Sequence, residues 1–190
     1  MRTSIIAILI LIAILAIPLY HFGVLRSIDV VEKQMPPTVF VFEKYQGSYK
    51  GIGDIMKELH KKLESDGIKV ERGIGIYFDN PSKVDAYHLR SLAGAVIEGE
   101  NLEKIKQFSS KYLMAELQSE PAYHAEFPLK GDISYMIAPI VVWPRFNKKM
   151  KDSSSEPTAG IEIYDSKNSK IDFYMYSKGG MDRFDLMWRQ

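Results

Sequence analysis

The sequence predicts an α+β protein in which one strand-helix-strand-strand unit occurs twice, behind an apolar N-terminal segment. Three observations lead to this prediction. Residues 1–25 are almost entirely apolar, a strand-helix-strand-strand order begins at residue 38, and the same order returns about 85 residues later. A chain of 190 residues allows one domain with an appendage. Each unit is too short to bury a good core alone, so we expect the two units to share one.

The composition excludes several classes of function. Lysine and arginine total 25 against 24 aspartate and glutamate, so no basic surface is expected and nucleic acid is not a predicted partner. Cysteine is absent, which excludes thiol nucleophiles, thiolate metal sites and disulfide bonds. The fold must therefore be stabilised by its hydrophobic core.

The N-terminal segment has the length and composition of a transmembrane helix. Residues 5–19 are 15 consecutive apolar residues, and residues 3–25 carry no formal charge over 23 positions. As a helix this stretch is roughly 34 Å long, enough for a hydrocarbon core of about 30 Å. We predict an uncleaved anchor over residues 1–25, which makes the lipid bilayer a partner, followed by a stalk over residues 26–37. A cleavable signal peptide is the alternative, although no clear cleavage site precedes Arg26.

The first repeated unit begins after the stalk. Residues 39–45 are rich in strand-forming side chains, and glycines follow them. One apolar stripe at offsets 0, 3, 4, 7 and 11 then predicts a helix that ends near residue 66; it consists of Ile52, Ile55, Met56, Leu59 and Leu63. Strands are expected over residues 73–78 and 89–97, separated by a turn at Asp79-Asn80-Pro81.

The second unit repeats this order. A strand over residues 123–127, a helix over 133–150 and strands over 160–164 and 171–176 are predicted; Pro139 and Pro144 are expected to interrupt the helix. Gly73-Ile74-Gly75-Ile76-Tyr77 matches Gly160-Ile161-Glu162-Ile163-Tyr164 at a separation of 87 residues, and Gly47 and Gly131 are separated by 84. The predicted domain covers residues 38–178, with modules 38–99 and 121–178 joined through 101–120, and residues 179–190 form a short tail.

The predicted binding site lies on one face of the central strands. Alternation places Ile74, Ile76, Ile161 and Ile163 toward the helices. The side chains assigned to the opposite, open face are Glu162, Tyr164, Tyr77, Tyr174 and Tyr176. Tyrosines with a carboxylate suit a flat ligand that is apolar or cationic. A half-solvated face without a ligand is the alternative.

Other chemical motifs give no site. His124 and Glu126 lie two apart on a strand without a third metal ligand nearby, so no metal is predicted. Gly51 and Gly53 lack the third glycine of a dinucleotide fingerprint, and no Gly-x-Ser-x-Gly motif occurs. We therefore predict no cofactor and no catalytic residue.

The repeated order and two local segments resemble the GyrI-like small-molecule-binding domain family. The segments are Glu162-Ile163-Tyr164 and Ile76-Tyr77-Phe78-Asp79-Asn80-Pro81. Further segments resemble the membrane-anchored branch that contains the testis-expressed ER-phagy receptor and its bacterial relatives. They are the N-terminal apolar helix, Tyr45 to Tyr49, Leu89 to Gly94 and Glu98-Gly99-Glu100.

This resemblance implies a single-pass membrane protein of the bacterial inner membrane or the endoplasmic reticulum membrane. By analogy with the family, Glu162 lies in a pocket between the modules and neutralises or hydrogen-bonds a cationic ligand, with tyrosines stacking around it. The implied function is non-enzymatic binding of a small molecule or partner in the groove between the modules. An ER-phagy receptor-like adaptor and a small hydrolase that uses Glu162 are the two alternatives.

Overall fold

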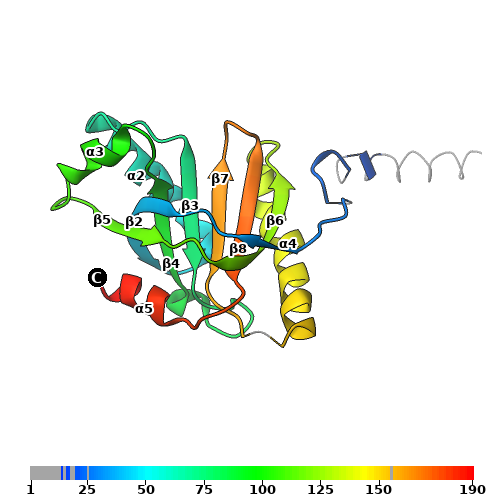
Figure 1. The fold of residues 1–190 in the computed structure, drawn as a ribbon. Helices are drawn as coiled ribbons and strands as arrows, with labels where there is room; N and C mark the ends of the chain where they lie inside the picture. The colour runs from blue at the N-terminus through cyan, green and yellow to red at the C-terminus, as the bar shows by residue number, and fades with distance from the viewer. Residues whose placement is uncertain (1–13, 15, 18–19, 25, 155) are drawn as a thin grey trace, which may run out of the picture.

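The fold is an α+β arrangement built on one antiparallel sheet. The computed structural model describes residues 14, 16–17, 20–24, 26–154 and 156–190. Their strands are β1 (Val31–Gln34), β2 (Thr38–Gln46), β3 (Arg72–Tyr77), β4 (Arg90–Val96), β5 (Leu113–Leu117), β6 (Pro121–Pro128), β7 (Gly160–Asp165) and β8 (Lys170–Tyr176). They form an eight-stranded sheet in the order β1-β6-β8-β7-β3-β4-β2-β5 (Figure 1).

The helices complete the two predicted units. The helices of the described residues are α2 (Ile52–Ser65), α3 (Asn101–Lys106), α4 (Ile133–Asp152) and α5 (Asp182–Arg189), with short 3-10 turns η1 (Tyr49–Gly51) and η2 (Ala86–His88). The order β2-α2-β3-β4 is repeated as β6-α4-β7-β8, which confirms the predicted succession of elements. The two units join edge to edge through β3 and β7, and β5 and β1 extend the sheet beyond β2 and β6.

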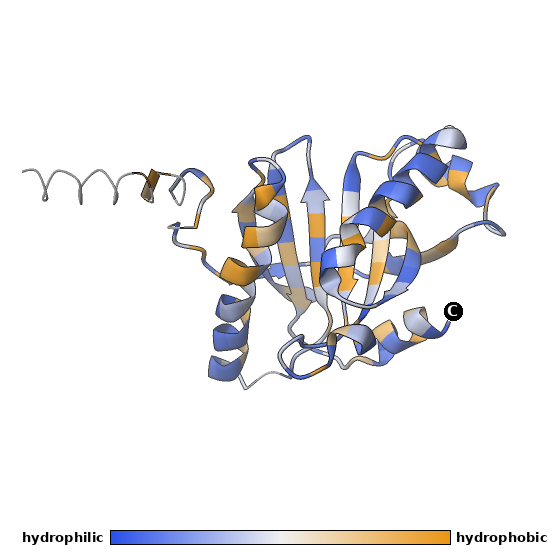
Figure 2. Cartoon of the chain, turned by 180° about the vertical axis from the view of Figure 1, so that it is seen from behind, coloured by the Kyte–Doolittle hydropathy of each residue, from blue (hydrophilic) through white to orange (hydrophobic). Residues whose placement is uncertain are grey.

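Helices α2 and α4 lie on the same face of the sheet, one over each unit (Figure 2). Leu59 and Leu63 of α2 pack with Val41 and Ala95 of β2 and β4. Helix α4 packs on β6 and β8 through a second cluster of buried side chains, which includes Val142 and Phe146. The central strands β3 and β7 therefore run between the two helices.

The four repeated isoleucines lie on the other face of the sheet, which corrects the prediction that they face the repeated helices. Ile74, Ile76, Ile161 and Ile163 are at most 1% exposed and belong to a third cluster with Phe184 of α5. The physical reason is that this face of the sheet is also shielded from solvent by a helix. Helix α5, formed by residues predicted to be a short tail, packs against it, so apolar side chains are needed there as well.

Two further expectations are corrected. Part of the predicted stalk belongs to the folded domain, because β1 pairs with β6, Met35 is fully buried, and Ile28 and Val30 pack against the α4 cluster.

Helix α4 continues through both of its prolines instead of breaking at them. Packing of Val142 and Phe146 against the sheet stabilises the helix across these positions.

The membrane prediction concerns residues that are mostly not described. Within the described residues, no helix has the length and hydropathy needed to cross a bilayer. Residues 1–13, 15, 18–19 and 25, which make up most of the predicted anchor, lie outside the described part of the chain.

Candidate functional site

The candidate site lies where the two units meet. Glu162 of β7 is paired directly with Gly75 of β3, and the two residues occupy equivalent positions in the repeat. The approximate two-fold axis that relates the two units therefore passes through this pair of residues. A second glutamate at position 75 would bring two carboxylates together in a buried environment, which is electrostatically unfavourable. The asymmetry leaves one carboxylate at the centre.

Gly75 also provides the space for a tyrosine. A Cβ atom added to Gly75 would lie 2.8 Å from the Tyr77 hydroxyl oxygen and 2.9 Å from its ring. The Tyr77 side chain therefore folds back over Gly75. This places its hydroxyl 2.7 Å from that of Tyr164, the equivalent residue of the second unit.

Glu162 is the acceptor at the end of a short hydrogen-bond network. The Trp143 indole Nε1 donates to one carboxylate oxygen at 2.8 Å, and the Tyr164 hydroxyl donates to the other at 2.7 Å. Because the Tyr164 proton is used in this bond, its oxygen accepts from Tyr77. The Glu162 residue is 2% exposed, so these donors replace water around the ionised carboxylate.

The environment brings the carboxyl close to its titration midpoint at neutral pH. Burial raises the pKa of Glu162 to about 7, although the hydrogen bonds from Tyr164 and Trp143 act in the opposite direction. Burial also raises the pKa values of Tyr77 and Tyr164, and the Glu162 charge adds to the effect. The tyrosines therefore remain neutral donors while Glu162 changes between its charged and neutral forms.

Two more tyrosines extend the cluster symmetrically. The Tyr49 ring meets the Tyr77 ring edge-on, with centroids 4.9 Å apart, and Tyr135 meets Tyr164 in the same way at 5.4 Å. Tyr49 lies just before α2 and Tyr135 lies in the first turn of α4. We call Tyr49, Tyr77, Tyr135 and Tyr164 the tyrosine cluster. Tyr135 is 41% exposed, whereas the other three are partly buried.

Three of the five predicted residues come together, and two do not. Glu162, Tyr164 and Tyr77 form the centre of the site, but their assignment to a face away from the helices is wrong, because Trp143 of α4 packs onto Glu162. Tyr174 and Tyr176 share a face with Ile161 and lie on the opposite side of the sheet. Glu162 is instead paired with Phe173, since one residue along β8 reverses the face.

Tyr174 and Tyr176 make different contacts on that opposite face. The Tyr174 ring stacks against His124, with centroids 4.6 Å apart, and His124 pairs with Asp172 at 2.8 Å. The Tyr176 hydroxyl donates to the Gln118 carbonyl oxygen. A role for these two tyrosines in ligand binding remains a prediction, and it would require a second site separate from Glu162.

Sequence reasoning missed Tyr49, Tyr135 and Trp143. The two tyrosines carried a usable signal, because they are separated by 86 residues, close to the spacing of the repeat. Trp143 carried none. Only the packing of α4 places the indole over β7.

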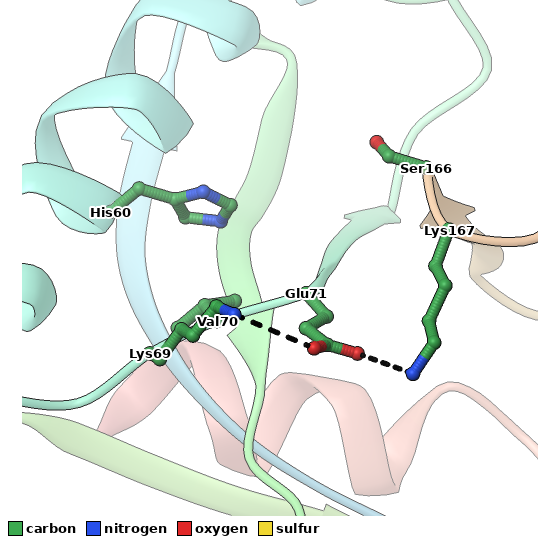
Figure 3. Close-up of a pocket in the computed structure, with 6 residues that line it drawn as sticks. All are labelled: His60, Lys69, Val70, Glu71, Ser166 and Lys167. Carbon is green, nitrogen blue, oxygen red and sulfur yellow. Dashed lines mark hydrogen bonds and ion pairs between the residues drawn. The ribbon is translucent and has the colours of Figure 1, made fainter.

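Two pockets open at the polar end of the central strands. One, of about 460 Å³, is lined by His60, Lys69, Val70, Glu71, Ser166 and Lys167 (Figure 3). Burial lowers the pKa of His60, and Glu71 pairs with Lys167 at 3.3 Å and with Lys69 at 4.0 Å. A second pocket, of about 310 Å³, adjoins it around Arg72 and Glu98. Neither is lined by Glu162, which is 2% exposed in this conformation.

Comparisons with known proteins identify the fold. No protein-family model and no curated protein match the sequence. The EcmrR–DNA complex structure is 9% identical with a TM-score of 0.56, and the match covers 92% of this chain and 67% of that one. The structure of SAV2435 bound to tetraphenylphosphonium is 12% identical with a TM-score of 0.52, over 80% of this chain and 94% of that one. At such identities the likeness concerns the fold, and the fold is GyrI-like.

Proposed function

We propose that this chain is a membrane-anchored, non-enzymatic binding domain that captures a small apolar cation at the tyrosine cluster, above Glu162. The observation that carries this proposal is the buried carboxylate of Glu162 at the junction of the units, hydrogen-bonded by Trp143 and Tyr164 and flanked by aromatic rings. The likeness to SAV2435, whose structure holds tetraphenylphosphonium, supports the same class of ligand.

The physical basis is electrostatic. A charge in a poorly solvated site interacts more strongly with an opposite charge than it would in water. Burial raises the pKa of the Glu162 carboxyl to about 7, and a bound cation would stabilise its charged form. Aromatic rings attract a cation through their faces and offer it apolar contact area.

The proposed role of Glu162 is electrostatic and involves no bond-making step. Glu162 is 2% exposed and lies beneath its two hydrogen-bond donors, Trp143 and Tyr164, so a substrate would not reach the carboxylate in this conformation. A cation that rests on the partly exposed rings of Tyr77 and Tyr164 would leave these bonds in place. Direct contact with the carboxylate would require Tyr164 or Trp143 to rotate away first.

Glu162→Gln should weaken binding of tetraphenylphosphonium about tenfold or more at pH 8, because it removes the charge while keeping the side-chain shape. Isothermal titration of the detergent-solubilised chain measures the affinity. Glu116→Gln, which removes an exposed carboxylate from edge strand β5, is the matched control and should bind like the wild type. Equal affinities of wild type and Glu162→Gln would remove Glu162 from the proposal.

The wild-type affinity should also fall as the pH falls. A cation prefers the ionised carboxylate, and below a pKa of about 7 a proton must leave before the cation gains its partner. We expect a loss approaching tenfold per pH unit below that value. In Glu162→Gln the same titration should be flat.

We infer that residues 1–25 hold the domain at a bacterial inner membrane or an endoplasmic reticulum membrane. The charge-free stretch of 23 residues supports this inference. Alkaline carbonate extraction of cells should leave the full-length chain in the membrane pellet, and a chain that starts at residue 26 should be soluble. That boundary keeps Ile28 and Val30, which pack on the α4 cluster. A soluble, shortened product from the full-length gene would instead indicate a cleaved signal peptide.

A further inference from the structure

The exposed apolar side chains of the described residues gather at one edge of the molecule. Eight of the ten large ones belong to the N-terminal segment, β1 or the first half of α4; they are Ile14, Ile17, Tyr20, Val31, Ile133, Tyr135, Met136 and Ile140. The other two are Tyr87 and Leu186. A concentration of this kind indicates a surface that contacts another apolar phase.

The outward surface of α4 differs from that of its counterpart in the first unit. Met136 and Ile140 are 71% and 74% exposed, and with Ile133 they form a stripe at helical spacing. The exposed positions of α2 hold Gly53, Asp54, Lys57, Glu58, Lys61, Lys62, Glu64 and Ser65. Both helices bury an inward face against the same sheet, so the fold itself does not require apolar side chains on the outside of α4. Figure 2 shows this contrast in hydropathy between the two helices.

The N-terminal segment reaches the domain at this same edge. A Cβ atom on Gly23 would lie 2.7 Å from Cγ of Pro128, the last residue of β6 and five residues before α4 begins. Ile28 and Val30 pack against the cluster that α4 also enters. Figure 1 shows the described residues before β1, drawn in dark blue, on the side of the domain where β6 and α4 lie. A chain anchored through residues 1–25 would therefore have α4 near the bilayer.

The second half of α4 carries basic side chains. Lys148 and Lys151 are exposed, and Asp152 is the acidic residue beside them; Lys149 is exposed too, but its ammonium lies over the ring of Tyr123 of β6. The outward surface thus changes along the helix from apolar to cationic. Helices that lie in a membrane interface combine apolar side chains with lysine or arginine, and anionic headgroups attract the basic part.

We propose that the outward surface of α4 lies on the lipid bilayer, with Ile133, Met136 and Ile140 in the interfacial layer and the lysines over anionic headgroups. This rests on the membrane anchor of the proposed function. Tyr135 and Trp143 of the same helix border the site, so an apolar cation dissolved in the bilayer would reach the tyrosine cluster from the membrane side.

The chain contains no cysteine, so single labels test this docking directly. Met136→Cys and Ile140→Cys carry an environment-sensitive fluorophore, and the full chain is reconstituted into vesicles of phosphatidylcholine and phosphatidylglycerol with a spin-labelled lipid. Asp54→Cys is the control, because Asp54 lies in the first turn of α2, the helix that covers the other unit, and its side chain is 86% exposed. Lipid quenching should be severalfold stronger at positions 136 and 140 than at 54. Equal, weak quenching at all three would overturn the proposal.

Two further readings separate this proposal from its alternatives. Vesicle flotation in carbonate measures membrane anchoring independently of the labels. If the chain floats with the vesicles but its labels are not quenched, the docking of α4 is contradicted and the anchor is not. If the chain fails to anchor, labelled protein is added to preformed vesicles, where quenching supports docking and its absence overturns it. A disulfide-linked dimer of Ile140→Cys under mild oxidation would assign the surface to a second copy, and a blue-shifted but unquenched label would assign it to the chain's own N-terminal segment.

Discussion

Replacing Glu162 with glutamine should stabilise the folded protein at alkaline pH and have little effect below pH 4. The folded-state pKa is about 7, above the ordinary value of 4.5, because burial disfavours the charged form. The folded state therefore binds a proton more tightly than the unfolded state does. The stability contribution of this protonation is complete below the unfolded pKa and is lost as the pH rises through 7.

The expected size of this effect is roughly 3 kcal/mol between pH 4 and pH 9, because a tenfold difference in proton affinity between the folded and unfolded states corresponds to about 1.4 kcal/mol. Glutamine does not titrate, yet it can accept from Trp143 through its oxygen and donate to Tyr164 through its nitrogen. Denaturant unfolding of the wild type and Glu162→Gln across this range measures the difference in unfolding free energy.

The other carboxylates titrate in the same way in the wild type and in Glu162→Gln. Their contributions therefore cancel in the difference between the two unfolding free energies. Glu116→Gln supplies the control, because its side chain is exposed on β5. Its unfolding free energy should follow that of the wild type across the range. A pH-independent difference for Glu162→Gln would contradict the raised pKa, and with it the electrostatic basis of the proposed site.

Truncating a central isoleucine in either unit should destabilise the whole domain. Ile76 of β3 and Ile163 of β7 are 0% and 1% exposed, and both belong to the cluster that the two units share with α5. Ile76→Ala and Ile163→Ala should each cost about 2 to 5 kcal/mol, from lost burial and the cavity left behind. Ile140→Ala on exposed α4 is the control and should cost far less.

Calorimetry of the same variants tests whether the units share one core. Because strands β3 and β7 are paired and their side chains pack together, we expect one unfolding transition that shifts as a whole in either variant. Two separated transitions, with Ile76→Ala lowering one and Ile163→Ala the other, would show that the units unfold independently.

Much of the local structure could be predicted from the sequence. Apolar spacing predicted α2 and the strands of both units correctly, and the match between Gly73–Tyr77 and Gly160–Tyr164 predicted the duplication. Glu162, Tyr164 and Tyr77 were recognised because a carboxylate between isoleucines interrupts that match. The tail was not predicted to pack, although Phe184 is fully buried, because eight residues of helix are stable only through tertiary contacts.

The sequence by itself determined the order of elements within the two repeated units, the duplication and the identity of the central carboxylate, because hydrophobic period and repeat spacing are local properties of the chain. Only the tertiary structure decided which face of the sheet each strand residue occupies. Alternation divides a strand into two sets of side chains, but both faces of this sheet are covered, by α2 and α4 on one side and α5 on the other. Glu162 therefore lies beneath Trp143, whereas Tyr174 and Tyr176 lie on the opposite face of the sheet. Strand pairing sets the register of these residues, and helix packing determines which helix covers each face.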